Sequence, residues 1–121
     1  MKKCILRIND VVIGDNIDIA DNFFTRLRGL MFRKTLPQNS GLMIYPCNSI
    51  HMFFMNFPLD ILFVDKNDNI VDYLENFDIN KISKIYSNAR YVVELPVGTI
   101  KLKNIQKNQK IFIQPLDKNN K

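Results

Sequence analysis

Short apolar segments, each about five to eight residues long, recur along most of the chain and are separated by Asn, Asp, Gly and Pro. Segments of that length, several with alternating apolar and polar residues, are typical of β-strands. The predicted strands cover residues 5–8, 11–13, 17–20, 41–45, 50–55, 59–65, 70–73, 91–95 and 110–113. Because the edges of so many strands must be hidden, we expect a mainly β domain, built as a small barrel or a folded-over sheet.

One segment has helical rather than strand periodicity. Between Phe23 and Met31 the apolar residues recur at spacings of three and four, and Asp21 or Asn22 can cap the first turn. We therefore expect one helix near residues 21–32, packed on the sheet. A short helical turn can also form near residues 99–105.

The length of 121 residues fits one globular domain, which we assign to residues 1–115, followed by a frayed basic tail at 116–121. The net charge of +5 comes from the end of the chain, because residues 1–100 hold 11 basic and 11 acidic side chains. The last 21 residues contain six lysines and one aspartate, but neither arginine nor the interleaved aromatic residues that stack on bases. This composition disfavours nucleic acid as a partner and predicts a solvated surface.

The composition also predicts where the protein acts. No run of about 18 apolar residues could span a membrane, and polar residues interrupt the start of the chain too early for a signal peptide. The two cysteines, Cys4 and Cys47, are too few for a disulfide framework and are expected as free thiols. We therefore predict a cytoplasmic protein without a membrane span.

Residues 46–65 contain the polar groups that most need explanation. They include His51, the single histidine, and Asp60, which precedes a strongly apolar segment. A buried carboxylate needs an arginine or several backbone N–H groups, and Arg28 and Arg33 are the natural ion-pair candidates. Alternatively, the arginine could clamp an anionic ligand while Asp60 orients it.

Glu94 lies within another apolar segment and allows two similar interpretations. It could be a structural carboxylate, in an ion pair or supporting the turn that follows, or a polar group on the rim of a pocket.

Catalysis by Cys47 and His51 is a further hypothesis, because a nearby imidazole can activate a thiol. In an extended strand, however, these residues would lie roughly 13 Å apart, so only a bend or a helical turn would join them. A zinc site lacks the usual paired ligand spacings, and we expect neither a metal nor a cofactor.

Several motifs in one order resemble a known family. They are R-L-R-G-L-M-F-R at residues 26–33, G-L-M at 41–43, C-N-S-I-H-M-F-F-M-N-F-P-L-D-I-L-F-V-D at 47–65, and A-R-Y-V-V-E-L-P-V-G at 89–98. The chain is identified as a member of the bacterial and archaeal family called domain of unknown function 192, in the subgroup with a Cys-x-x-Ile-His start. The resemblance implies one compact β-rich domain without an established activity, substrate or cofactor.

Two hypotheses about function remain. The first is a module that binds a small molecule or a protein partner in an apolar groove edged by Arg28, His51, Phe53 and Asp60. The second is a hydrolase-like enzyme that uses Cys47 and His51 or a carboxylate. Nucleic-acid binding through the basic end is a weaker third.

Overall fold

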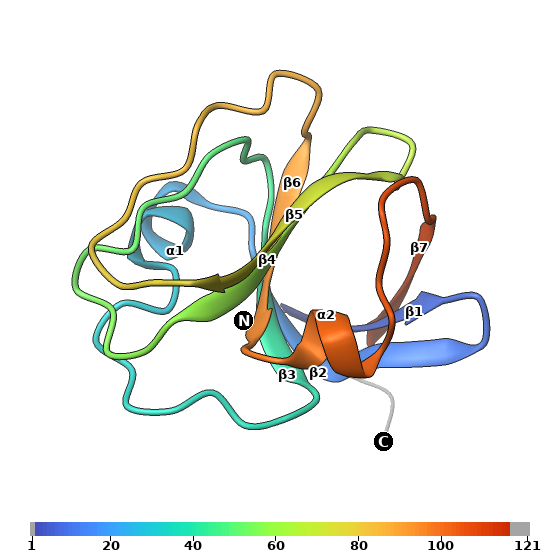
Figure 1. The fold of residues 1–121 in the computed structure, drawn as a ribbon, viewed down its shortest axis with the longest axis horizontal. Coiled ribbons are helices and arrows are strands. Elements are labelled where there is room, and N and C mark those ends of the chain that lie inside the picture. The colour runs from blue at the N-terminus through green and yellow to red at the C-terminus, as the bar shows by residue number, and fades with distance from the viewer. Residues whose placement is uncertain (1, 117–121) are drawn as a thin grey trace.

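A single seven-stranded sheet dominates the computed structural model, which describes residues 2–116 (Figure 1). The sheet order is β5-β4-β6-β3-β2-β1-β7, and every neighbouring pair is antiparallel except β2 and β3. The strands are β1 (Lys2–Ile8), β2 (Val11–Ala20), β3 (Ser40–Ile44), β4 (Leu59–Val64), β5 (Ile70–Phe77), β6 (Tyr91–Pro96) and β7 (Ile111–Leu116). The predicted mainly β fold is confirmed.

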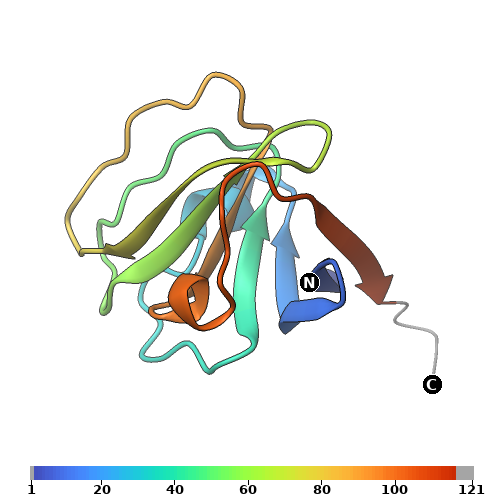
Figure 2. The same cartoon turned by 45° about the vertical axis from the view of Figure 1, so that its right-hand side comes forward.

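The sheet folds over on itself but does not close into a barrel, so the folded-over alternative is the one adopted (Figures 1 and 2). Its two edge strands, β5 and β7, approach each other at one end only. There an isolated bridge joins Asn69 to Lys110, and the amide of Ile70 donates to the carbonyl of Gln109 at 2.9 Å. Beyond this point the two edges separate.

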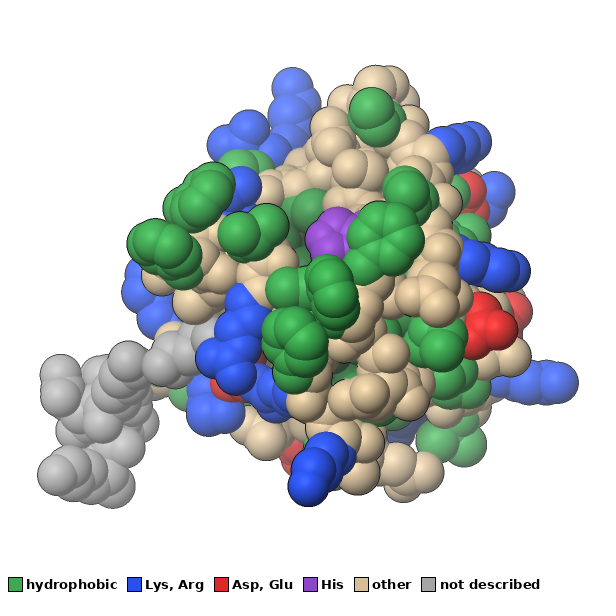
Figure 3. Space-filling view, turned by 90° about the vertical axis from the view of Figure 1, so that its left-hand side faces the viewer, with side chains coloured by type: hydrophobic (Ala, Val, Ile, Leu, Met, Phe, Trp, Pro, Cys, Tyr) green, Lys and Arg blue, Asp and Glu red, His purple; other side chains and the backbone are tan. Residues whose placement is uncertain are grey.

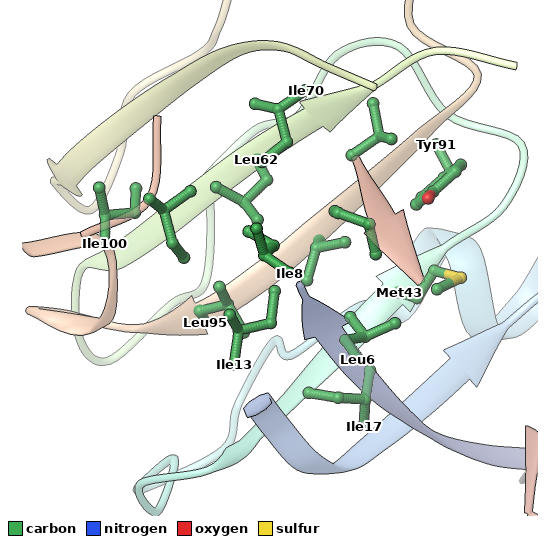
Figure 4. Close-up of a cluster of buried hydrophobic side chains, with 14 of the residues drawn as sticks. Leu6, Ile8, Ile13, Ile17, Met43, Leu62, Ile70, Tyr91, Leu95 and Ile100 are labelled. Atoms are coloured by element: carbon green, nitrogen blue, oxygen red, sulfur yellow. The ribbon is translucent and has the colours of Figure 1, made fainter. Parts of the chain in front are cut away.

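Both faces of the central strands are buried, which explains why β4 is apolar at nearly every position. The inner face carries the larger cluster, which includes Leu6, Leu62 and Val93 (Figure 4). Helix α2 (Thr99–Leu102) covers part of it through Ile100 and confirms the predicted helical turn. The outer face carries a second cluster, which includes Leu42, Ile61, Phe63 and Val92.

Helix α1 (Phe23–Arg28) forms where the sequence predicts a helix, but it is only six residues long. Asn22 and Thr25 form a capping box at its start, and Gly29 ends it with a φ of 51°. The expectation that its apolar residues pack on the sheet is wrong, because no residue of α1 is buried. Leu30, in the turn after the helix, enters the outer cluster instead.

The predicted strand at residues 50–55 is also wrong. Phe54 has a φ of 63°, and the segment forms only an isolated bridge between His51 and Ile82. Residues 45–58 instead run as a loop beside residues 78–90, held by bonds such as that from the Met52 amide to the Lys81 carbonyl at 2.7 Å. Together with α1, these loops gather over the outer face of the sheet (Figures 1 and 2).

The predicted frayed tail lies outside the described residues, except for Leu116, which ends β7.

Candidate functional site

The outer face of the sheet contains one buried carboxyl group, that of Glu94 on β6. Glu94 pairs with Leu42 on β3 and with Ile61 on β4, and both of these neighbours belong to the outer apolar cluster. Because side chains alternate along a strand, Glu94 shares this face with Val92, whereas Val93 and Leu95 enter the inner cluster. The carboxyl group is therefore directed toward α1 and the loops.

A narrow pocket of about 60 Å³ opens above Glu94. Its walls come from α1 and the turn that follows it, and from the loop after β3; they include Arg26, Gly29, Cys47 and His51. A cavity of this size holds a few water molecules or one functional group, and it is far too small for an entire drug-sized ligand. Any larger ligand must lie mainly on the surrounding surface.

Glu94 is 4% exposed, and its Oε1 atom has no hydrogen-bond partner. Burial raises the pKa of Glu94 from its ordinary 4.5 to about 7. Gly29 brings backbone close to this group, since a Cβ atom there would lie 3.8 Å from Oε1. A buried acid whose pKa is raised to near neutrality can accept or donate a hydrogen bond, so it suits recognition of a polar group.

Arg26 is the second polar group in the wall of the pocket. Its Nε atom is buried and has no partner, while its guanidinium group makes a long bond of 3.5 Å to the carbonyl of Pro46. Across residues 2–116, Arg26 Nε and Glu94 Oε1 are the two buried side-chain polar atoms without a hydrogen bond. Such atoms are rare in folded proteins, and here both belong to residues of one pocket.

Cys47 and His51 both line the pocket, but they do not form the nucleophile–base pair of the catalytic hypothesis. The Cys47 thiol donates to the carbonyl of Ser49 at 3.0 Å, and His51 Nδ1 accepts from the amide of Phe53 at 3.3 Å. Burial raises the pKa of Cys47, which disfavours the reactive thiolate. This arrangement gives no support to thiol catalysis.

Large apolar side chains lie beside the pocket and remain exposed. Phe53 stacks on His51 with ring centroids 5.2 Å apart, and Phe32 packs against Phe54 at 5.4 Å. Seen from the side that carries α1, apolar side chains gather around the single histidine (Figure 3). We call Leu27, Phe32, Phe53 and Phe54, which are 39–65% exposed, the apolar rim.

Asp60 lies on the opposite face of the sheet and does not line this pocket. Both carboxylate oxygens accept hydrogen bonds from backbone amides, those of Asn76 at 2.9 Å and of Gly98 and Ile100 at 3.0 Å each. It thus holds β5 and the start of α2 against β4. The sequence predicted either an arginine or several backbone N–H groups as partners of Asp60, and the structure has the backbone N–H groups.

The ion pairs with arginine that were one alternative for Asp60 and for Glu94 do not form among the described residues. The four salt bridges there involve neither Arg28, Asp60 nor Glu94. Arg33 pairs instead with Asp18 at 3.5 Å. Arg28 is exposed at the mouth of the pocket, where its charge is available to a ligand.

The pocket therefore brings together Arg28 and His51 from the sequence-based candidates, with Phe53 beside them on the rim and Glu94 at the base. Sequence reasoning missed Arg26 and Gly29. Both lie in the R-L-R-G-L-M motif, but a short helix without buried residues gives no pattern that shows which arginine turns inward.

Larger hollows exist elsewhere on the surface, but they are lined differently. One of about 420 Å³ lies between residues 65–67 and 87–90 and is formed mainly by polar loop residues. Neither of the two unpartnered buried atoms belongs to it. Within residues 2–116 there is also no cluster of three or more metal-ligating side chains, and neither described helix could cross a membrane.

The fold and this site define a small, mainly β domain. Its narrow pocket has a buried carboxyl group at the base and the apolar rim beside it. The chain belongs to the family described as "Uncharacterized ACR", domain of unknown function 192, whose model matches residues 5–113.

Among its relatives, a protein of family UPF0127 from Thermococcus gammatolerans is 31% identical over 114 residues, covering 88% of this chain and 71% of that protein. A second one, from Pyrococcus horikoshii, is 38% identical over 90 residues, covering 68% of this chain and 73% of that protein. A crystal structure of a protein of unknown function from Novosphingobium aromaticivorans has the same fold. Its TM-score is 0.78 at 19% identity, over 93% of this chain and 84% of that one.

Proposed function

We propose that this domain is a binding module that docks a peptide segment of a protein partner over the apolar rim and takes one polar group of that segment into the pocket. The observation that carries the proposal is that Arg26 Nε and Glu94 Oε1, both buried and unpartnered, belong to residues of one pocket with exposed aromatic side chains beside it. A ligand that fills the pocket and leaves either atom unpaired loses about 1–3 kcal/mol for that atom, so only a polar group that hydrogen-bonds to both atoms is accepted there.

The apolar rim supports the same proposal. Exposed aromatic side chains beside a buried polar pocket are typical of a protein-binding surface. The pocket is too small for a complete ligand, whereas the rim supplies the additional contact area that a peptide would bury.

The test is selection of peptides from a displayed random library on the wild-type protein, followed by affinity measurements on single variants. Peptides bound as proposed lose roughly tenfold or more in affinity for Phe54→Ser and Phe32→Ser. Phe112→Ser is the matched control, because Phe112 is a similarly exposed aromatic side chain, 51% against 63% for Phe54, but lies on the edge strand β7.

Two results would contradict the proposal. One is the absence of enriched peptides in repeated selections, and the other is a set of peptides that bind the rim variants as tightly as the wild type.

A further inference from the structure

The two unpartnered atoms in the pocket require opposite hydrogen-bonding groups. Arg26 Nε carries a hydrogen and needs an acceptor, whereas Glu94 Oε1 is an acceptor whenever the carboxyl group is ionised. They do not satisfy each other, since no salt bridge or hydrogen bond joins Arg26 to Glu94 in the described part of the chain. While Glu94 is ionised, a ligand group that fits must therefore offer one acceptor and one donor.

The space and the surroundings restrict that group further. Arg26, Cys47 and Glu94 all line the same small volume of about 60 Å³. A planar group of a few atoms fits such a volume, and it would displace the few water molecules that the pocket can hold.

Charge then separates the candidate groups. An ammonium group offers donors alone and would be repelled by Arg26 in the wall and Arg28 at the mouth. A carboxylate offers acceptors alone and would face the Glu94 carboxyl, so it could bind only together with a proton. A carboxamide is neutral and carries both an acceptor oxygen and two donor hydrogens.

We propose that the group taken into the pocket is a carboxamide, presented by an Asn or Gln side chain of an apolar peptide segment that lies on the rim. This inference rests on the proposed function and names its specificity. The carboxamide oxygen accepts from Arg26 Nε, and its NH₂ group donates to Glu94 Oε1. The flanking apolar residues of the segment cover Leu27, Phe32, Phe53 and Phe54.

The test uses four small probes built on the same four-carbon chain, applied to the intact protein: butyramide, butyrate, butylammonium and N,N-dimethylbutyramide. The resonance of the Arg26 Nε–H group, assigned by its loss in Arg26→Met, reports occupancy of the pocket. We expect a saturable shift with butyramide and at least roughly tenfold weaker binding of the dimethyl compound, which has no donor for Glu94.

Variants of Glu94 supply the second readout. Glu94→Gln keeps an acceptor oxygen and is expected to retain butyramide binding, whereas Glu94→Met removes it and weakens binding roughly tenfold. Phe112→Ser, far from the pocket on β7, should behave as the wild type. Thermal unfolding of each variant establishes that it is folded.

Dependence on pH provides a third readout. The ionisable groups around Glu94 are Arg26 and Arg28 from α1 and Cys47 and His51 from the loop after β3. Butyramide binding should change little across pH 7. A carboxylate ligand would instead lose affinity above pH 7, as Glu94 gives up its proton.

The inference is overturned if butyrate or butylammonium binds more tightly than butyramide, if no probe saturates, or if Glu94→Met leaves butyramide binding unchanged. Such results would not contradict the proposed function if the selected peptides still lose affinity for Phe32→Ser and Phe54→Ser. Conversely, butyramide binding without rim-dependent peptides would contradict the docking proposal and leave the carboxamide pocket intact.

Discussion

A Cβ atom at Gly41 would lie 2.5 Å from the backbone carbonyl oxygen of Glu94 on the neighbouring strand. Gly41 begins one of two Gly-Leu-Met segments, and the glycine of the other segment also lies near Glu94. A Cβ atom at Gly29 would lie 3.8 Å from the Glu94 side chain. The two glycines thus approach Glu94 from different sides. One allows the close contact of β3 with β6, and the other forms the wall beside the carboxyl group.

Gly41→Ala should destabilise the fold, because the added methyl group would meet backbone that cannot move without disturbing two strands. We expect a loss of at least about 2 kcal/mol in the free energy of unfolding, measured with urea. Gly98→Ala is the comparison: its φ of 94° is strained for alanine, but nothing lies within 4 Å of the new atom. A loss below about 0.5 kcal/mol for Gly41→Ala would contradict the close contact, whatever the loss for Gly98→Ala.

Glu94 should make stability depend on pH in a defined direction. Its folded pKa of about 7 lies above its ordinary value of 4.5, so between these values the folded protein holds a proton that the unfolded chain has released. Its contribution is therefore complete below pH 4.5 and is lost as the pH rises through 7, by roughly 3 kcal/mol in total.

The measurement is the difference in unfolding free energy between wild type and Glu94→Gln across this pH range, which cancels the other titrating groups. The wild type should become less stable relative to the variant as the pH rises. A difference that does not change with pH would mean that Glu94 is not a desolvated acid.

Asp60→Ala should strongly destabilise the protein, because three backbone amides lose their acceptor. We expect a loss of roughly 3–5 kcal/mol in chemical unfolding, with Asp60→Asn less severe since it keeps one acceptor oxygen. Asp15→Ala serves as the control for an exposed aspartate and should change stability by less than about 0.5 kcal/mol. A loss for Asp60→Ala as small as that of the control would contradict the structural role of this carboxylate.

Cys47 should react slowly with iodoacetamide at neutral pH, because burial raises its pKa and depletes the thiolate. The reference is the same thiol in the urea-unfolded protein, with the modified site identified by peptide mapping. His51→Ala should leave the native rate unchanged. Rapid alkylation that this variant abolishes would instead revive the nucleophile–base hypothesis.

Much of the sheet could be predicted from the sequence, because apolar alternation and turn residues mark strands such as Leu59–Val64 and Tyr91–Pro96. The errors occur where apolar residues do not belong to the core. Phe53 and Phe54 suggested a strand, and Phe23, Phe24 and Leu27 suggested a packed helical face, yet all five side chains are exposed.

The pocket could be predicted only in part. Glu94 is visible as an acid in an apolar strand, but its face depends on pairing with β3 and β4, which no local pattern encodes. Asp60 is likewise an acid in an apolar strand, but its role is structural. It lies on the other face of the sheet, and both of its carboxylate oxygens accept hydrogen bonds from backbone amides. The difference between a structural carboxylate and a candidate site is therefore set by tertiary structure.

The most direct test of the central claim is an NMR titration. The chemical shift of the Glu94 carboxyl carbon is measured as a function of pH, with and without butyramide. We predict titration near pH 7 in the free protein and a distinct change of this resonance when butyramide binds. Titration near pH 4.5, with no response to butyramide, would show that Glu94 is an ordinary solvated acid and would contradict the account of the pocket.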